Sequence, residues 1–352
     1  MMNPDSLIPF RVRDLAAYVP GEQINRPGVI KLNTNENPYP PSPTVAEALA
    51  QVSGDALRLY PDPLAREVCG ILADLHGVKP GQILAGNGSD EVLALCTRAF
   101  VQPGQGIGYL DPSYSLYPVL TAIHGARMTP VPLNQAFQWE PGPAPANCPL
   151  FFITNPNAPT GMLHDREVVA AFCRSYQGVV VIDEAYVDFA TDTCLDLART
   201  LPNVLVTRTL SKSYALAGIR FGYAVGNSEL IGALYKLKDS YNLNLLTQKA
   251  AAAALRDQAW MKNLVERIRA TREAFVGELV RLGFSTFPSE TNFVWTRPPD
   301  HLSAPDLYQA LKRQDILIRH FSPPGLREHV RITIGTDEQM ATLARALQNL
   351  CA

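Results

Sequence analysis

The sequence predicts an α/β fold with a large, doubly wound and mostly parallel sheet, followed by a smaller C-terminal α+β domain. Between about residues 80 and 225, short apolar runs alternate with helical patterns, which is typical of parallel strands buried on both faces by crossover helices. From about residue 240, a long helical stretch leads into a second group of short strands. The length of 352 residues exceeds that of most single domains, so two domains are expected.

The large domain is expected to alternate strands with helices. The stretch 83–93 reads as a strand that runs through a glycine-containing turn into a helix, and residues 164–176 have the pattern of a further helix. The other expected strands are residues 106–110, 127–133, 150–154, 178–183, 203–209 and 221–226. Ligands of such open sheets bind at the carboxyl ends of the strands, so the site is expected there.

The C-terminal part is expected to form an antiparallel or mixed sheet with two helices. Apolar residues at helical spacing predict a helical bridge from Ser240 to about Leu282. Strands are expected at 284–288, 292–295, 316–321 and 329–336, and helices at 305–313 and 337–350. We therefore divide the chain into an N-terminal arm (1–35), a large domain (36–245), and an interdomain helix with the small domain (246–352). The arm is expected to pack against the small domain or a neighbouring subunit.

The composition excludes several classes of protein. Lys and Arg number 31 against 33 Asp and Glu, which gives a net charge of −2, so neither nucleic acid nor an anionic membrane is expected as a partner. The six cysteines form no CxxC pair and have no metal-ligand spacing to the histidines, so neither disulfides nor a metal site are expected. The chain shows no signal peptide and no run of ~20 apolar residues, which favours the cytoplasm.

Asp183 is the first candidate for chemistry, because it ends the apolar run 178–183. A carboxylate at the end of a buried strand is costly unless a cation holds it, so a cationic partner is implied. The alternative is a structural carboxylate that caps the next helix. Tyr186, three residues later, can direct its hydroxyl into the same crevice.

Lys212 is the second candidate, because hydroxyl side chains surround it in the sequence. Thr209, Ser211 and Ser213 flank it, and Arg220 follows eight residues later. This arrangement suits a nucleophilic amine of lowered pKa beside a phosphate that hydroxyls and a guanidinium bind. The alternative is a solvated lysine in a surface loop, and the apolar strand expected directly after the segment weakens that interpretation.

Gly88, Ser89 and Asp90 form the third candidate, at the turn between an expected strand and its helix. Amides at a helix N-terminus bind anions. The spacing matches neither Walker A nor GxGxxG, and the alternative is a tight turn with Ser89 or Asp90 as the N-cap. Together the three candidates provide what pyridoxal 5'-phosphate (PLP) needs: an amine for its aldehyde, a carboxylate for its ring nitrogen, and an anion cradle for its phosphate.

The same residues resemble a known family, the fold type I PLP-dependent aminotransferases, and within them the class II histidinol-phosphate aminotransferases. The likeness spans nearly the whole chain, and the block from TLSKS to GIR is highly specific for the superfamily. YVPGEQ together with VRITIGT points to the subfamily. The similar segments are YVPGEQ, LNTNENPYPPSP, LRLYPDP, GNGSDEVL, DPSYSLYP, TNPNAPTG, VVIDEAYVDF, TRTLSKSYALAGIRFGYAVG, SETNFVW and VRITIGT.

This resemblance implies a role for each candidate. Lys212 is expected to join the cofactor covalently and to move the substrate's Cα proton, Asp183 to pair with the ring nitrogen, and Tyr186 to bond the phenolic oxygen. Tyr114 is expected to stack on the ring, unless it is a core aromatic. Tyr60 matches a tyrosine that reaches the cofactor phosphate of the partner subunit, which implies a homodimer. The phosphate is expected to be bound by the turn at Gly88, Ser89 and Asp90, and by Thr209, Ser211 and Arg220.

One departure from the family pattern concerns NPNAPTG. Relatives usually read NPxNPTG, whose second asparagine bonds the phenolic oxygen, but this chain has Ala158 there. Asn157 or Asn155 can serve instead, and we prefer Asn157 because an irregular loop absorbs a shift of one residue. The alternative is that both asparagines only shape the loop.

The resemblance also implies the substrate-binding residues. Arg331 matches an arginine that grips the α-carboxylate of 2-oxoglutarate, and Arg319 one that helps to grip a substrate phosphate, unless each makes only a structural ion pair. Tyr18 and Asn292 are expected to complete the pocket as neutral donors. The expected reaction is transamination between L-histidinol phosphate and 2-oxoglutarate. The alternatives are threonine-phosphate decarboxylation, a broad aromatic aminotransferase, and a non-catalytic PLP-binding sensor module.

Overall fold

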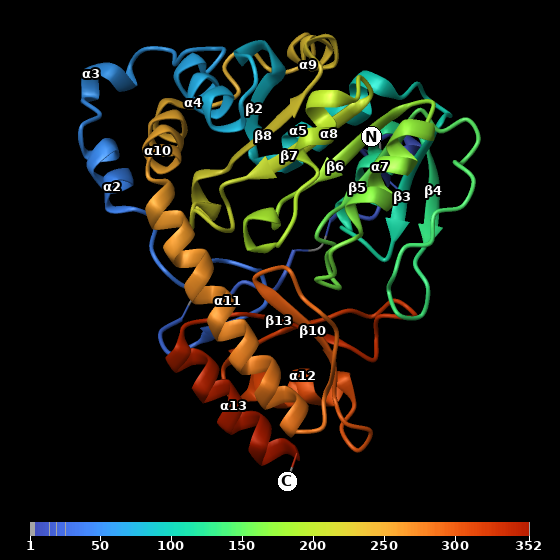
Figure 1. Ribbon diagram of the computed structural model, residues 1–352, viewed down its shortest axis with the longest axis vertical. Coiled ribbons are helices and arrows are strands. Elements are labelled where there is room, and N and C mark those ends of the chain that lie inside the picture. Colours follow the sequence, from blue (N-terminus) through green and yellow to red (C-terminus); the bar gives the residue numbers. More distant parts are fainter. Residues whose placement is uncertain (1–3, 14, 19, 25, 352) are drawn as a thin grey trace.

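The structure is a computed structural model that describes residues 4–13, 15–18, 20–24 and 26–351, and its two lobes are built on separate sheets (Figure 1). The sheet of the large lobe has seven strands in the order β2-β8-β7-β6-β5-β3-β4. Every neighbouring pair is parallel except those of β8, which runs antiparallel to β2 and β7. The predicted mostly parallel sheet is confirmed. Its strands are β2 (Ile83–Asn87), β3 (Gly106–Asp111), β4 (Arg127–Pro132), β5 (Leu150–Thr154), β6 (Val179–Asp183), β7 (Val204–Thr209) and β8 (Phe221–Gly226).

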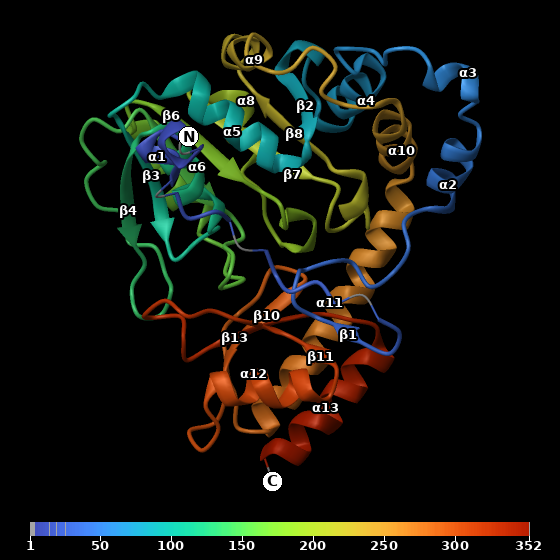
Figure 2. The same ribbon diagram turned by 180° about the vertical axis from the view of Figure 1, so that it is seen from behind.

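Helices cover both faces of this sheet, because its central strands are apolar on both sides. Phe151 of β5 contacts Phe172 on one face, whereas Phe152 stacks on Tyr117 on the other. Figure 1 shows α7 and α8 in front of the sheet, and Figure 2 shows α5 and α6 from behind. The helices of the large lobe are α2 (Pro43–Ala50), α3 (Gly54–Leu57), α4 (Arg66–His76), α5 (Gly88–Phe100), α6 (Leu116–His124), α7 (Arg166–Ser175), α8 (Leu195–Thr200) and α9 (Ser228–Tyr235).

The small lobe contains a four-stranded antiparallel sheet, in the order β12-β13-β10-β9. Two further strands, β1 and β11, pair in parallel as a separate ladder. The strand expected at 316–321 is therefore wrong as one element, since its two halves belong to different sheets. The elements are β1 (Ile30–Lys31), β9 (Ser285–Thr286), β10 (Phe293–Arg297), β11 (Ile316–Leu317), β12 (Arg319–His320), β13 (Val330–Thr333), α12 (Ala304–Arg313) and α13 (Asp337–Cys351).

Two helices, rather than the single helical stretch expected from Ser240, connect the lobes. Helix α10 (Leu245–Arg256) packs against α2 and α4, and α11 (Gln258–Arg281) continues along the small lobe (Figure 1). The break falls at Asp257, whose carboxylate accepts a hydrogen bond from the Trp260 amide at 3.1 Å and caps α11. At 1.5 Å per residue, α11 is about 36 Å long, enough to reach across the small lobe.

The N-terminal segment touches both lobes. Its pairing through β1 confirms the expected contact with the small lobe. Helix α1 (Phe10–Arg13) follows a short turn, η1 (Pro4–Leu7), and contacts α6 of the large lobe, which the sequence did not predict. The exact domain limits at 35 and 245 stay predictions. Within the described ranges, no helix is long and apolar enough to cross a membrane.

Candidate active site

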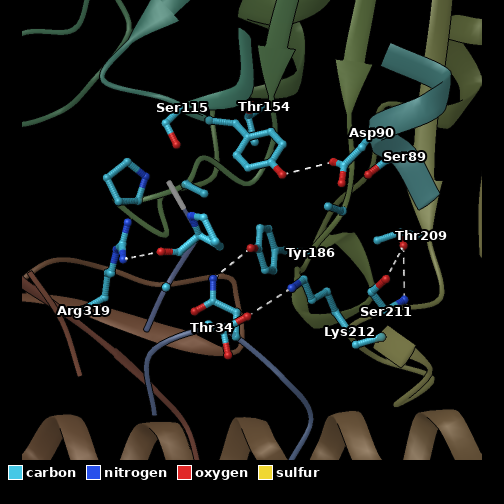
Figure 3. A pocket seen from close by; sticks show the side chains of 18 of the residues that line it. Thr34, Ser89, Asp90, Ser115, Thr154, Tyr186, Thr209, Ser211, Lys212 and Arg319 are labelled. Atoms are coloured by element: carbon cyan, nitrogen blue, oxygen red, sulfur yellow. Dashed lines mark hydrogen bonds between the residues drawn. The ribbon is translucent and has the colours of Figure 1, made fainter. Parts of the chain in front are cut away.

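A cavity of about 320 Å³ lies where the sheet of the large lobe faces the small lobe (Figure 3). Thr154, Asp183 and Thr209, the last residues of β5, β6 and β7, lie in its wall. This is the edge at which the sequence predicted a ligand. The lining residues that the sequence singled out are Tyr18, Ser89, Asp90, Tyr114, Asp183, Tyr186, Thr209, Ser211, Lys212, Arg220, Arg319 and Arg331.

Lys212 enters the cavity as a partly buried amine. Its Nζ donates to the carbonyl oxygen of Thr34 at 3.4 Å and lies 5.8 Å from the ring centroid of Tyr186 (Figure 3). Burial, followed by the positive charge of Arg331, lowers the pKa of Lys212 to about 8. A substantial fraction of the amine is therefore neutral near neutral pH, as a nucleophile or a base requires.

Asp183 lies at the base of the cavity, with only 2% of its surface exposed. Its carboxylate accepts two long hydrogen bonds, from the Tyr117 hydroxyl at 3.3 Å and the Thr207 hydroxyl at 3.4 Å. Burial and then the like charge of Asp90 raise the pKa of Asp183 to about 7. A cation placed against this carboxylate would lower its pKa again, so the site is suited to a protonated ring nitrogen.

The hydroxyl of Tyr186 accepts a hydrogen bond from Nδ2 of Asn35 at 2.8 Å. Asn35 is held in turn, because Thr333 donates to its side chain and accepts from its backbone amide, both at 3.0 Å. The proton of the Tyr186 hydroxyl remains available to donate to an acceptor in the cavity. Sequence reasoning missed Asn35, although it lies within the quoted segment LNTNENPYPPSP.

The predicted anion cradle combines the start of α5 with the loop after β7. Thr209 donates to Ser211 at 2.9 Å, and Arg220 donates to Ser211 at 3.5 Å and to Asp90 at 3.2 Å. Gly88 begins α5 with a φ of +77°, and a Cβ there would meet the guanidinium of Arg220. The cradle therefore needs glycine at this position. The arrangement offers amides, hydroxyls and a guanidinium to one phosphate.

Tyr114 forms a side wall of the cavity. Its hydroxyl donates to Asp90 at 3.1 Å, and its ring meets Tyr18 and Tyr117 edge to face, with centroids 6.1 and 5.8 Å away. The ring face is thus held by aromatic neighbours on two sides, which suits stacking on a planar ligand.

Two arginines face the cavity from the small lobe. Arg331 is buried between the rings of Phe293 and Phe321, and it donates to the backbone oxygen of Asn33 at 3.2 Å. Its Nε is buried and has no hydrogen-bond partner among the described residues. Arg319 donates to the backbone oxygen of Pro20 at 3.2 Å and also lies over Phe321. Burial lowers the pKa of Arg331, so an anionic ligand would stabilise its charge.

Four predicted site residues do not line the cavity: Gly88, Asn157, Asn292 and Tyr60. The Asn157 side-chain nitrogen donates to the Pro112 backbone oxygen and to the Thr160 hydroxyl, both at 3.0 Å. Its side-chain oxygen is buried without a partner among the described residues. Asn292 lies behind the wall, where it donates to the Asn35 backbone oxygen at 3.0 Å. Tyr60 is 80% exposed. The cofactor contact expected of Asn157 has no support in the lining, and its role stays a prediction.

Asn155, the second asparagine considered, is also engaged elsewhere. Its side-chain oxygen accepts from the His164 amide at 2.8 Å, and its nitrogen points to the Cys194 sulfur. Ala158 and Pro159 line the cavity instead. Asn35, which bonds Tyr186, also lines the cavity.

The residues present fit PLP on three independent observations. A partly buried amine of lowered pKa, a buried carboxylate that accepts long hydroxyl hydrogen bonds, and a cradle that a Cβ would fill all meet at one cavity. Among the described residues, no group of three or more His, Cys, Asp or Glu side chains is placed to hold a metal ion.

We predict that PLP and borohydride label Lys212 of the apo-protein selectively near neutral pH, because its pKa of about 8 leaves more neutral amine than an ordinary lysine has. Peptide mapping checks this, with Lys249→Ala as a surface control that should be labelled like the wild type. Lys212→Ala should lose both the label and turnover. Labelling of another lysine would contradict the assignment.

We also predict that Gly222→Ala weakens PLP binding by roughly tenfold or more, since the added methyl group would strike the backbone of Gly88 and Ser89 and displace the start of α5. Fluorescence titration of the apo-protein with PLP measures this. Gly218→Ala is the control, because nothing lies within 4 Å of a Cβ there. Equal affinities in the two variants would show that the cradle tolerates displacement.

Comparison with known proteins supports this interpretation of the site. The sequence model of aminotransferase class I and II matches residues 27–347. Histidinol-phosphate aminotransferase of Geobacter sp. (strain M21) is 47% identical over 343 residues, covering 96% of this chain and 97% of the relative. The enzyme of the same name from Geotalea uraniireducens (strain Rf4) is 47% identical over 347 residues, covering 98% and 100%.

Solved structures share the fold. The crystal structure of histidinol-phosphate aminotransferase from Sinorhizobium meliloti in complex with pyridoxal-5'-phosphate superposes with a TM-score of 0.86 at 28% identity, covering 98% of each chain. L-threonine-O-3-phosphate decarboxylase from Porphyromonas gingivalis gives a TM-score of 0.81 at 24% identity, over 92% of this chain and 99% of that one, which shows the fold alone. With its site, its sequence and its fold in agreement, this chain belongs to the class I and II aminotransferase family.

Proposed function

We propose that this protein is a PLP-dependent histidinol-phosphate aminotransferase. It transfers the amino group between L-histidinol phosphate and 2-oxoglutarate, giving imidazole acetol phosphate and L-glutamate in L-histidine biosynthesis. The observation that carries the proposal is the meeting of Lys212 and Asp183 with two small-lobe arginines, Arg319 and Arg331, in one cavity. The names of the relatives at 40–47% identity point to the same substrate.

The residues of this chain divide the work of the reaction. Bound PLP supplies an electron-withdrawing ring, which stabilises negative charge at the carbon that loses its proton. Asp183 keeps the ring nitrogen protonated, and Tyr186 donates to the phenolic oxygen. The amine of Lys212 holds the cofactor between turnovers and then carries the Cα proton, for which a pKa of about 8 is suited.

Substrate selection is assigned to the two arginines with Tyr18. One substrate carries a phosphate and no carboxylate, whereas the other carries carboxylates and no phosphate, so the binding groups must serve both. A guanidinium makes paired hydrogen bonds to either anion. The buried Nε of Arg331, which lacks a partner among the described residues, supports an anion at this end of the cavity.

We further propose that the enzyme acts as a cytoplasmic homodimer. Tyr60 stacks on Tyr241 with centroids 4.3 Å apart, although it is 80% exposed. Leu57, Leu59 and Leu64 are also exposed by 58%, 58% and 41%. Exposed apolar side chains within one short segment favour a protein partner. In a dimer, Tyr60 of one copy would lie near the cofactor phosphate of the other copy.

The proposed reaction is tested by mixing the PLP-loaded enzyme with L-histidinol phosphate alone. The absorption of the bound cofactor should convert to that of the amine form, and adding 2-oxoglutarate should restore it and release L-glutamate. Release of carbon dioxide from L-threonine phosphate, without this conversion, would instead identify a decarboxylase. A cofactor spectrum that none of these compounds changes would favour a binding module.

Arg319→Ala should raise KM for L-histidinol phosphate far more than for a neutral aromatic amino acid, by about 1.5 to 3 kcal/mol in kcat/KM for the phosphorylated substrate. The reason is the loss of a charge-assisted hydrogen bond to the phosphate. Arg313→Ala, an exposed arginine on α12, is the control and should leave both substrates unaffected. Equal losses for both substrates would remove the phosphate role and favour a broad aromatic aminotransferase.

A further inference from the structure

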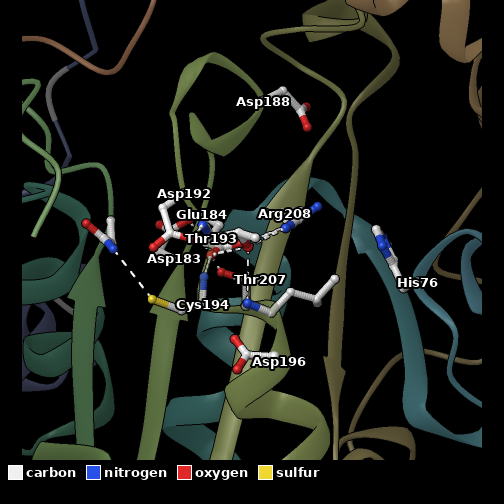
Figure 4. Close-up of polar contacts among 12 residues, drawn as sticks. His76, Asp183, Glu184, Asp188, Asp192, Thr193, Cys194, Asp196, Thr207 and Arg208 are labelled. Carbon is white, nitrogen blue, oxygen red and sulfur yellow. Dashed lines mark hydrogen bonds and ion pairs between the residues drawn. The ribbon is translucent and has the colours of Figure 1, made fainter. Parts of the chain in front are cut away.

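A buried ion pair lies directly behind the cavity, on the face of the sheet away from Asp183. The Nε and NH2 atoms of Arg208 donate to one oxygen of Glu184 at 2.9 and 2.7 Å (Figure 4). The side chain of Glu184 is 0% exposed and that of Arg208 is 13% exposed. Neither residue lines the cavity, and neither has a role in the reaction described above.

Further bonds tie this pair to the loop that carries Tyr186. The Glu184 carboxylate also accepts from the Thr193 hydroxyl at 2.9 and 3.0 Å and from the Cys194 amide at 2.5 Å. Arg208 donates to the same hydroxyl at 2.9 Å. The loop between Glu184 and Thr193 is therefore closed at its base, and Tyr186 lies within it.

Each member of the pair is adjacent in sequence to a residue of the Asp183 site. Glu184 follows Asp183, and Arg208 follows Thr207, whose hydroxyl bonds the Asp183 carboxylate. Successive residues of a strand point to opposite faces, so Thr207, which bonds Asp183, and Arg208, which bonds Glu184, lie on opposite faces of β7. The Glu184 amide donates to the Thr207 oxygen at 2.8 Å and joins the two layers.

The hydroxyl hydrogen bonds to the Asp183 carboxylate are longer than those of the pair behind it. Its two side-chain contacts are 3.3 and 3.4 Å, whereas those of Glu184 to Arg208 and Thr193 are 3.0 Å or less. We infer that Glu184 and Arg208 are positioning residues, which hold Asp183, and the loop of Tyr186, in register with the bound cofactor. The inference rests on the proposed PLP chemistry but not on the identity of the substrate.

The pair also reaches toward Lys212. Arg208 is the penultimate residue of β7, and Lys212 lies in the turn after it. On the same side, Ser213 donates to Asp188, which belongs to the loop that Glu184 closes. Figure 4 places His76 beyond Arg208, and His76 bonds Tyr223 of the neighbouring strand β8 at 2.8 Å. Groups on both sides of the cofactor thus depend on one buried pair.

Glu184→Gln tests this, because it keeps the shape of the side chain and removes the charge that Arg208 needs. We expect kcat to fall about tenfold or more with KM nearly unchanged, as for a displaced catalytic group. The visible circular dichroism of bound PLP, which reports the orientation of the cofactor, should change without any substrate present. Arg208→Lys, which keeps the positive charge but loses the paired donors, should change both signals in the same direction but by less.

Asp196→Asn is the matched control, since it breaks the ion pair with Arg166 on the same lobe, where the side chains are 33% and 34% exposed. It should leave kcat and the dichroism unchanged. A Glu184→Gln protein that loses thermal stability but keeps wild-type dichroism and kcat would overturn the inference, because the pair would then be structural only. Wild-type enzyme that fails to transaminate L-histidinol phosphate would instead refute the proposed function, leaving the dichroism test valid.

Thr193→Val keeps the inference testable if Glu184→Gln does not fold. This change preserves both charges and removes the hydroxyl that bonds both Glu184 and Arg208. A smaller shift of the dichroism and of kcat in the same direction is expected. Wild-type values for both would overturn the inference.

Discussion

The burial of one carboxylate governs the architecture of this enzyme. Asp183 ends a strand that is buried on both faces, and its carboxylate accepts two long hydroxyl contacts there and no ion pair among the described residues. Such a group is stable as an anion only with a cation close by. The Lys212 amine bonds the Thr34 oxygen and is not paired with Asp183. The cavity therefore has room beside Asp183 for a ligand that carries its own positive charge.

The two lobes supply the other groups that surround this carboxylate. The large lobe provides the carboxylate, the amine and the anion cradle from the ends of its strands and one helix. The small lobe adds the guanidinium groups of Arg319 and Arg331. Residues 33–36 lie between them, so Lys212 and Asp183 of the large lobe and the arginines of the small lobe share one wall.

The sequence predicted the large lobe well, because each strand buried on both faces is a continuous apolar run. It also identified Lys212, Asp183 and the cradle from the residue types, while their detailed roles came from family resemblance. The division between β11 and β12 could not be predicted, since Ile318 continues the apolar run of Ile316 and Leu317 and no turn residue marks the change of sheet. The break at Asp257 did leave a signal, because aspartate is a favoured N-cap.

The contacts that the sequence could not predict are those between distant segments. Asn35 bonds Tyr186 and Thr333, and Tyr117 bonds Asp183, so their importance depends on tertiary positions rather than on local patterns. The alanine at position 158, where relatives usually have asparagine, is the opposite case. There a clear departure in sequence led to an expected contact that the cavity lining does not support, because the Asn157 amide is taken up by its own loop and by Pro112.

The short ladder between β1 and β11 has a consequence for the evolution of the small lobe. Lys31 pairs with Leu317, and the next residues of the chain, Asn33 to Glu36, form the wall that contacts Lys212. Replacements at Ile316 or Leu317 would therefore move a catalytic wall although neither side chain lies in it. Substitutions at these interior positions are expected to be constrained by the geometry around Lys212. Tolerance to substitution would then depend on which backbone segment a residue supports, rather than on its distance from the bound cofactor.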